Sequence, residues 1–276
     1  MQRRHFVTAT ASGLLGVSSI PRHLWQPAED RWQYDGAGTL ARFGVLTPDF
    51  DPVPESELWA MAPRGVSIHA TRVARSGRSA AGFVEAPFVD DAVDRLVELA
   101  PDAILLGYSS SSYALGADAD ERVRARLEQR AKGIPVIFTC PAANAAFQHL
   151  GVTRLSVVHP PWWREEWNDE GSAYWRAAGF EVLQCTRLLP LRSFSEVTAA
   201  EVFEYVARQT PRAAQAVFVG GNGMRAVGAV RALEARLGRP VLTANQVLLW
   251  EALRRSGRPA PIARYGSIFT SRGGKR

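Results

Sequence analysis

The sequence contains almost no lysine: of its 33 basic residues, only Lys132 and Lys275 are lysines, and the rest are arginines. The arginines are scattered, and no basic stripe interleaved with aromatic residues occurs. The formal charge of +6 therefore does not indicate a nucleic-acid partner, because contact with a phosphate backbone needs a concentrated basic surface. Metal-ligand spacings, phosphate-binding loops and dinucleotide fingerprints are also missing, so we expect no cofactor and no metal.

Cysteine is scarce as well, with Cys140 and Cys185 the two present. Both follow apolar, strand-like runs, which favours two free thiols over a disulfide bridge. No apolar run is long enough for a transmembrane helix, so we expect no membrane span. With 276 residues, 46% of them apolar, the chain is long enough to bury the core of one or two domains.

The N-terminal segment differs in composition from the rest of the chain. Arg3 and Arg4 precede a mildly apolar segment, residues 9–20, which Pro21 closes. This order resembles a twin-arginine export signal. We expect residues 1–38 to be an export signal and linker, and the protein to be periplasmic or otherwise exported. The alternative is a basic N-terminal helix on a cytoplasmic protein.

The remaining sequence repeats one pattern of strands and helices. Residues 42–48 are echoed by residues 154–160 at an offset of 112, and a strand that ends in Gly107 is echoed by one that ends in Gly220. Residues 134–137 match residues 239–242 in the same order along the chain. Three anchors in one order indicate an internal duplication. We predict an N-terminal lobe over 39–150 and a C-terminal lobe over 151–276, with a last strand and tail that can return to the first lobe.

The fold class that this alternation predicts is α/β. Short apolar strands alternate with longer amphipathic helices, which is typical of a mainly parallel sheet flanked by helices in each of two pseudo-symmetric lobes. In such sheets ligands bind beyond the carboxyl ends of the strands. We therefore expect one cleft between the lobes, where these strands end. Its expected substrate-binding residues are Thr47, Pro48, Asp51, Ser110, Gly220, Gly221 and Asn222.

Five segments together carry a resemblance to a known family. They are residues 44–48 (GVLTP), 106–113 (LGYSSSSY), 150–155 (LGVTRL), 220–223 (GGNG) and 265–269 (YGSIF). In this order they resemble the aspartate/glutamate racemase superfamily, nearest to the branch of arylmalonate decarboxylase and maleate cis-trans isomerase. The resemblance implies a cofactor-independent enzyme in which two lobes enclose a carboxylate substrate. It also implies two catalytic cysteines, one per lobe, that move a proton at the carbon next to the carboxylate or attack as a nucleophile.

Neither cysteine position holds a cysteine in this chain. The resemblance places the first on Ser109 or Tyr108, and the second on Gly221 or Gly220. A cysteine introduced at Gly221 is therefore expected to restore a thiol to the second lobe. Asp51 also departs from the asparagine that the isomerase branch has after its first strand.

The residue types that remain suggest other catalytic groups. Ser109 needs a neighbour to take its proton, since no Gly-x-Ser-x-Gly elbow is present. His159 ends a strand of the second lobe and titrates in a useful range, although a loop histidine is the plainer interpretation. We therefore expect Ser109, His159 and Tyr108 to be the catalytic residues. Cys140, at the end of a predicted strand, could reach the rim of the cleft or be a small buried residue.

Backbone and aromatic groups complete the expected cleft. The serine run 109–112 and the glycine run 220–223 lie at strand-to-helix turns, where N–H groups bind a carboxylate, or where they only form tight turns. Trp162 and Trp163 follow His159 and either bound the pocket or pack in the core.

Two functions fit these patterns. The first is a cofactor-independent lyase, racemase or isomerase that acts next to the carboxylate of a small mono- or dicarboxylic acid. The second is an exported carboxylate-binding or sensing protein that has lost catalysis. The expected partner in both is a small carboxylate, and a homo-oligomer is compatible with either.

Overall fold

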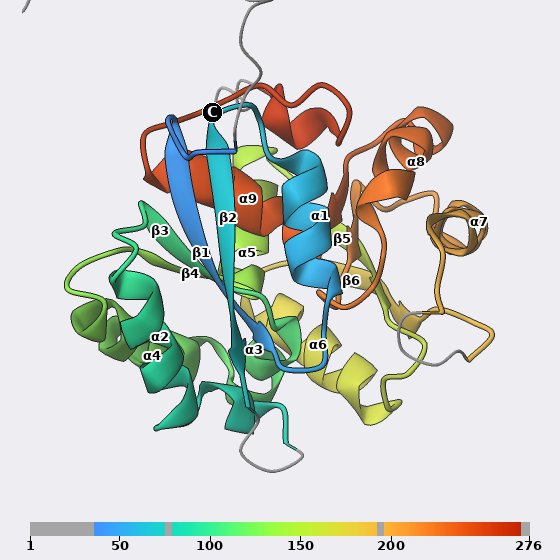
Figure 1. Ribbon diagram of the computed structural model, residues 1–276. Helices are drawn as coiled ribbons and strands as arrows, with labels where there is room; N and C mark the ends of the chain where they lie inside the picture. Colours follow the sequence, from blue (N-terminus) through green and yellow to red (C-terminus); the bar gives the residue numbers. More distant parts are fainter. Residues whose placement is uncertain (1–35, 75–78, 192–195, 272–276) are drawn as a thin grey trace, which may run out of the picture. The chain divides into compact units, whose positions relative to one another are not determined.

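Two four-stranded sheets form the framework of the computed structural model (Figure 1). The structure describes residues 36–74, 79–191 and 196–271, so the expected export signal lies outside the described residues. The strand order is β2-β1-β3-β4 in the first sheet and β6-β5-β7-β8 in the second, and all strand pairs are parallel. The same order in both sheets confirms the predicted fold of two α/β lobes.

The elements within the described ranges are as follows. The strands are β1 (Ala41–Pro48), β2 (Val66–Val73), β3 (Ala103–Leu106), β4 (Val136–Phe138), β5 (Arg154–His159), β6 (Glu181–Arg187), β7 (Ala216–Val219) and β8 (Val241–Thr243). The α-helices are α1 (Val53–Met61), α2 (Phe88–Val97), α3 (Ser109–Leu115), α4 (Ala117–Arg130), α5 (Thr139–His149), α6 (Glu166–Ala177), α7 (Ala199–Gln209), α8 (Val230–Leu237) and α9 (Ala244–Arg255).

The pattern of apolar residues along the sequence explains why these segments form strands and helices. All four residues of β3 and all four of β7 are buried, as expected for central parallel strands that helices cover on both faces. Helix α2 buries Val89, Ala92, Val93 and Leu96, which lie on one stripe at helical spacing. Capping boxes begin α7 at Thr198 and α9 at Thr243.

The two lobes also repeat individual hydrogen bonds. Glu128 Oε1 accepts from the backbone N–H of Val136 at 3.1 Å, and Glu234 Oε1 accepts from that of Val241 at 3.1 Å. In each lobe a glutamate on the helix before the last strand thus fixes the start of that strand. This repetition extends the duplication from the strand order to single side chains.

Two expectations are corrected in the region of α5 and α9. Cys140 does not end a strand, because β4 stops at Phe138 and Thr139 begins α5. Among the described residues no strand follows β8. The segments that reach the first lobe are α9, which packs on α5, α1 and β3, and the tail, where Ser271 is hydrogen-bonded to His149 of α5 at 3.1 Å. In turn Phe147 of α5 packs edge-on against Phe218 of β7. A helix of each lobe therefore packs against the sheet of the other lobe.

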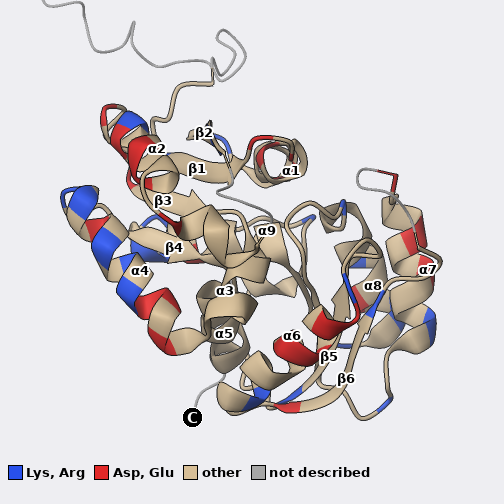
Figure 2. Cartoon of the chain, turned by 90° about the horizontal axis from the view of Figure 1, so that it is seen from below, with Lys and Arg blue, Asp and Glu red and all other residues tan. Residues whose placement is uncertain are grey.

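Charged residues lie on the outer helices. Figure 2 shows both signs along α2 and α4, whereas α3 and α5 are tan. Arg126 pairs with Asp90, and Arg130 pairs with Asp94 at 2.6 Å, so these two helices are linked by ion pairs. None of the helices in the described ranges has the length and apolarity that a bilayer span requires.

Candidate active site

A cavity of about 360 Å³ opens where the strands of the two lobes end. Strands β1, β3, β5 and β7 run parallel within their sheets, so the residues that follow each of them meet at this edge. Both lobes contribute to the wall. The lining residues are Phe50, Asp51, Tyr108, Ser109, Ser110, Pro160, Trp162, Trp163, Trp167, Gly221, Asn222 and Gly223.

Ser109 is held between the lobes by two hydrogen bonds. Its backbone N–H donates to Asn222 Oδ1 at 2.8 Å, and its Oγ accepts from the N–H of Gly221 at 3.1 Å. The hydroxyl hydrogen of Ser109 has no acceptor among the described residues and is free to donate to a ligand. Asn222 in turn donates from Nδ2 to Thr139 Oγ1 at 3.1 Å. The polar floor of the cavity is therefore fixed before a ligand binds.

Backbone N–H groups provide further donors at this floor. The N–H groups of Ser110, Asn222 and Gly223 donate to no partner within the described residues. No arginine or lysine lines the cavity in the described part of the chain. A carboxylate bound here would thus be held by N–H and O–H donors, as predicted for the serine and glycine runs.

Asp51 is the carboxyl group of the cavity. It follows β1, and its Oδ1 accepts from the N–H of Val53 at 3.0 Å at the start of α1. Its Oδ2 accepts no hydrogen bond from the residues that the structure describes. Burial raises the pKa of Asp51 to about 6, against the lowering effects of the Val53 hydrogen bond and of the charge on Arg72. This carboxyl group can therefore carry a proton close to neutral pH.

His159 does not line the cavity. Its side chain is fully buried behind the cavity wall, under Trp163, with the two rings 4.7 Å apart. Its Nδ1 is hydrogen-bonded to Asn168 Oδ1 at 2.8 Å, and its Nε2 to the hydroxyl of Tyr113 at 3.2 Å. Nδ1 must donate to the amide oxygen of Asn168, so in the neutral imidazole Nε2 accepts from the Tyr113 hydroxyl, whose oxygen also accepts from Trp175.

Burial also lowers the pKa of His159 to about 4, although the hydrogen bond with Asn168 opposes the change. An imidazole with both nitrogens engaged and a low pKa is a poor proton carrier for a ligand in the cavity. The structure therefore does not support the expected catalytic role of His159. The alternative of a loop histidine is also wrong, because His159 is the last residue of β5 and is fully buried.

Aromatic side chains form much of the remaining cavity wall. Trp162, Trp163 and Trp167 come from the segment between β5 and the first turn of α6, and Trp163 and Trp167 meet edge to face at 5.3 Å. Phe50 and Tyr108 add aromatic surface from the first lobe. Trp162 and Trp163 thus bound the cavity, as the first of the two interpretations predicted.

The other predicted site residues divide into two groups. Asp51, Tyr108, Ser109, Ser110, Gly221 and Asn222 line the cavity. Thr47, Pro48 and Gly220 lie behind it: Thr47 Oγ1 donates to the carbonyl of Asp51 at 3.3 Å, and the carbonyl of Pro48 accepts from the Asp51 N–H at 3.1 Å. Thr47 and Pro48 therefore shape the turn that carries Asp51 and do not touch a ligand.

Sequence reasoning missed Phe50, Trp167 and Thr139, whereas Gly223 belongs to the glycine run that it had assigned to the cleft. Thr139 directly follows β4, so its place at a strand end could have indicated it. Phe50 lies in the loop that the sequence analysis already placed in the cleft. Trp167 carried no signal beyond its neighbour Trp163.

The two cysteines lie outside the cavity wall. Cys140 is fully buried at the start of α5, where its Sγ contacts the carbonyl of Ser109 at 3.5 Å. Cys185, on β6, lies 3.9 Å from His159 Nδ1. Both thiols are free, and burial raises the pKa of each, to about 12 for Cys185. Over the described ranges, no group of three or more His, Cys, Asp or Glu side chains is arranged to hold a metal ion.

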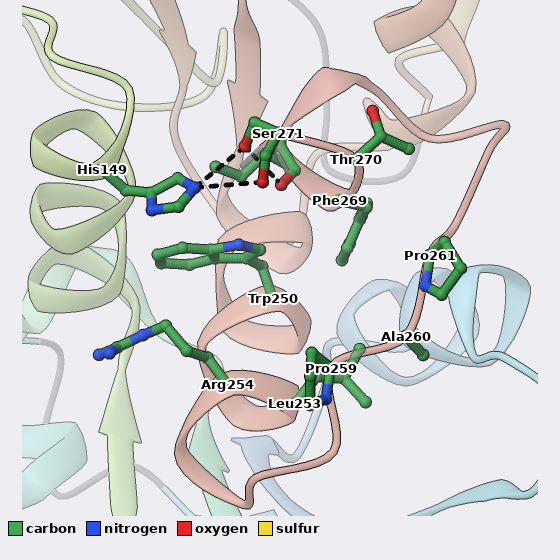
Figure 3. Close-up of a pocket in the computed structure, with 11 residues that line it drawn as sticks. His149, Trp250, Leu253, Arg254, Pro259, Ala260, Pro261, Phe269, Thr270 and Ser271 are labelled. Atoms are coloured by element: carbon green, nitrogen blue, oxygen red, sulfur yellow. Dashed lines mark hydrogen bonds between the residues drawn. The ribbon is translucent and has the colours of Figure 1, made fainter. Parts of the chain in front are cut away.

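A second cavity, of about 390 Å³, lies beside the C-terminal half of α9 (Figure 3). Trp250 lies between His149, at 5.4 Å between the rings, and the guanidinium of Arg254, at 5.6 Å. His149 is hydrogen-bonded to Ser271 at 3.1 Å, and Arg254 pairs with Glu251 at 2.6 Å. These polar groups are already paired, and the cavity is not at the strand ends, so it is the weaker candidate.

Comparisons with known structures return the same fold. A cysteine-to-alanine mutant of the maleate isomerase Iso from Pseudomonas putida S16, solved with maleate, has a TM-score of 0.77 at 18% identity and covers 84% of this chain and 98% of its own. Unliganded arylmalonate decarboxylase has a TM-score of 0.71 at 20% identity, with 83% and 99% covered.

A third structure is a cysteine-to-serine mutant of maleate cis-trans isomerase from Nocardia farcinica, with a covalently bound succinylcysteine intermediate. Its TM-score is 0.73 at 22% identity, and it covers 83% of this chain and 98% of its own. A search of curated protein sequences gives no match. The family model described as arylmalonate decarboxylase matches residues 48–269, which include parts of both lobes, from the end of β1 onward, and every residue that lines the site. The chain therefore belongs to the arylmalonate decarboxylase family, within the aspartate/glutamate racemase superfamily.

Proposed function

We propose that this protein is a cofactor-independent enzyme that decarboxylates a small malonate-type acid bearing an apolar or aromatic substituent. The observation that carries this proposal is the composition of the cavity. A carboxyl group of raised pKa, a row of N–H and O–H donors and an aromatic wall face one space of about 360 Å³. Membership of a decarboxylase family supports the choice of reaction.

The polar floor suits the carboxylate that the substrate keeps. The Ser109 hydroxyl and the N–H groups of Ser110, Asn222 and Gly223 are available as donors. They are most useful when the carboxylate becomes an enediolate, because its charge then increases next to donors that are already oriented. The floor would therefore bind the reaction intermediate more tightly than the substrate.

The aromatic wall suits the substituent and the carboxylate that leaves. Trp162, Trp163 and Trp167 offer apolar surface and no charge to the carboxylate placed against them. An ionised carboxylate loses solvation in such surroundings, whereas neutral CO2 does not, so the apolar wall favours its departure.

The proposed step balances with one proton. The bond between the central carbon and the departing carboxylate breaks, and its electron pair stays on the central carbon as an enediolate while CO2 leaves. The protonated Asp51 then forms a C–H bond at that carbon and becomes a carboxylate, which water reprotonates. Tyr108, whose phenol also lines the cavity, is the second candidate donor. Ser109, expected to be catalytic, binds the carboxylate in this scheme.

This scheme uses no thiol. The Nocardia farcinica maleate isomerase was solved with a covalently bound succinylcysteine intermediate. No cysteine lines the cavity in the described part of this chain, and the Cys140 thiol is fully buried. A covalent cysteine intermediate is therefore not part of the proposal.

One observation favours a second function, a carboxylate-binding protein without catalysis. The described residues that line the cavity include no thiol, imidazole or amine. If Asp51 transferred no proton, the same floor and wall would still bind an aryl carboxylate. Proton transfer to carbon is thus the property that separates the two functions.

The test is to incubate the purified protein with phenylmalonate in D2O, measuring CO2 release and deuterium at the product's α-carbon. Asp51→Asn is the test variant, and Asp49→Asn, an exposed carboxyl group outside the cavity wall, is the matched control. The proposal requires turnover by the parent and the control, with loss in Asp51→Asn. Tight binding of phenylacetate without turnover of any arylmalonate would instead support the binding function.

A further inference from the structure

Glu57 joins the first lobe to the second beneath the cavity floor. It lies on α1 and is 7% exposed. Its Oε1 accepts from the backbone N–H groups of Ala226 and Val227 at 2.7 and 3.0 Å, and its Oε2 accepts from Asn245 Nδ2 at 2.8 Å. All three donors belong to the second lobe. This one carboxylate therefore fixes both the loop after β7 and the first turn of α9.

Asn245 passes this constraint to Asn222. An ionised carboxylate can only accept, so Asn245 must turn its NH2 group toward Glu57. The second hydrogen of that group goes to the carbonyl of Asn222 at 2.9 Å. Asn245 Oδ1 is then left to accept from Asn222 Nδ2, at 2.9 Å.

Asn222 is the last residue in this row of hydrogen bonds and lines the cavity. Its NH2 group is committed to Asn245 and to Thr139 Oγ1 at 3.1 Å, while Thr139 donates its own proton to the carbonyl of Leu106. Asn222 Oδ1 must therefore face the N–H of Ser109, at 2.8 Å. Only one orientation of the two amide groups satisfies every donor from Glu57 to Ser109.

We infer that Glu57 is a positioning residue for the cavity: its carboxylate sets the orientation of the Asn245 and Asn222 amides, and through them the position of Ser109. Glu57 does not line the cavity and touches no substrate. Burial raises the pKa of Glu57 to about 7 although its three hydrogen bonds oppose the rise, so the ionised form is populated from neutral pH upward. The carboxylate that orients the two amides is therefore present mainly above about pH 7, and exchange is to be measured there.

Glu57→Gln replaces an acceptor with a donor at one end of this row of hydrogen bonds. If the Gln oxygen keeps the N–H groups of Ala226 and Val227, its NH2 group faces Asn245 Nδ2, which is donor against donor. Asn245 and then Asn222 must rotate their amides to relieve this contact. The NH2 group of Asn222 then faces the N–H of Ser109, and the hydrogen bond between the lobes is lost.

Amide hydrogen exchange tests the relay without any substrate. We expect exchange of the Ser109 N–H to accelerate at least roughly 10-fold in Glu57→Gln. The N–H of Gly107, bonded to Leu46 in the first sheet, should keep its rate. Glu234→Gln is the matched control, since Glu234 also accepts from two backbone N–H groups but lies away from the cavity. Unchanged exchange at Ser109, or equal acceleration at Gly107, would overturn the inference.

A second variant separates orientation from simple loss of the carboxylate. In Glu57→Gln with Asn245→Asp, the Gln NH2 group donates to one Asp oxygen, and the other accepts from Asn222 Nδ2. The swap keeps the charge but loses the bond to the Asn222 carbonyl. The double variant should therefore recover most of the slow exchange at Ser109, and either single variant should not. A double variant that folds and exchanges as fast as Glu57→Gln would refute the relay.

A measurement of activity rests on the proposed function, so its result is interpreted independently of the exchange result. With phenylmalonate, kcat should fall roughly 100-fold in Glu57→Gln, as for a displaced binding group, and should recover in part in the double variant. If the parent turns over no malonate, the proposed function fails while the exchange result at Ser109 stands. If the parent is active and Glu57→Gln keeps its kcat within about 3-fold, the positioning role fails instead.

Discussion

Gly221 lies directly against the ring of Pro160. A Cβ atom built on Gly221 would be 2.1 Å from Pro160 Cγ, and the φ angle of +83° is itself one that side-chain-bearing residues rarely adopt. This contact opposes any side chain at Gly221, one of the two positions to which the resemblance assigns the second-lobe cysteine. A cysteine introduced at Gly221 would displace Pro160 from the cavity wall, so we no longer expect it to create activity.

Gly221→Ala should destabilise the protein more than backbone strain alone predicts. Gly133 is the matched control, because its φ angle of +87° is similar and nothing lies within 4 Å of an added Cβ. We expect Gly133→Ala to cost about 1 kcal/mol of the free energy of unfolding, and Gly221→Ala clearly more. Urea unfolding of both variants measures the difference. Equal losses would mean that the loop of Gly221 moves aside freely.

The pH profile should show Asp51 as a proton donor. Burial raises its pKa to about 6, so the protonated form is abundant below that pH and falls about tenfold for each unit above it. Glu57, whose pKa is about 7, must be ionised to position Ser109, so kcat for phenylmalonate should peak between about pH 6 and 7. The decrease above the peak should vanish in Asp51→Asn together with most of the activity. Activity that keeps rising above pH 7 would assign Asp51 the role of a base.

Global stability should also depend on Glu57. The pKa of Glu57 is near 4.5 when exposed and about 7 when folded. Its contribution to the free energy of unfolding is therefore fully present below pH 4.5, where Glu57 is protonated in both states, and is lost as the pH rises through 7. A shift of this size corresponds to about 3 kcal/mol. Chemical unfolding at several pH values should give a smaller decline for Glu57→Gln than for the parent. Some decline remains, because Asp51 titrates in the same direction.

The aromatic wall predicts a preference for substituted acids. Trp162→Ala should weaken binding of phenylmalonate about 10-fold and leave malonate nearly unchanged, since only the first presents a ring to the wall. Trp59→Ala removes an exposed tryptophan of α1 and serves as the control. Isothermal titration calorimetry of both ligands measures this. A parallel loss for malonate would place the ring elsewhere.

Thiol reagents should leave the function intact. Cys140 is fully buried and Cys185 half-buried, and burial raises the pKa of both, so little thiolate forms. We expect the folded protein to keep its activity after treatment with iodoacetamide, with mass spectrometry to show the extent of labelling. Rapid inactivation with labelling of Cys140 and no unfolding would show that this thiol takes part in the reaction.

The position of the site was readable from the sequence because the fold repeats. Strand ends related by an offset of about 112 residues placed Ser109, Gly221 and Asn222 at one edge, and the structure brings them within hydrogen-bond distance. The role of His159 was not readable. It ends β5 as expected, but the aromatic segment that follows folds back over it, and that packing depends on contacts with Tyr113 and Trp175 from distant parts of the chain.

Glu57 was missed for a related reason. Nothing in the sequence VPESELWAM marks one of its two glutamates as buried, since Glu55 pairs with Arg72 at the surface while Glu57 meets Ala226 and Val227. The hydrogen-bond partners of Glu57 lie about 170 residues away in the sequence, so they can be identified only from the folded structure. Asp51, in contrast, follows directly from its place after β1.

Helices α5 and α9 occupy corresponding places, each directly after the last strand of its sheet, and they pack against each other while each covers the sheet of the other lobe. If the two lobes descend from one ancestral unit, that unit alone would have left an apolar sheet face open to water. It would have needed a second copy, related by a two-fold axis, to close that face with its own helix. Fusion of the two copies would have freed each half to change separately, so that Trp163 of one half and Asp51 of the other could come to line one cavity at a formerly symmetric interface.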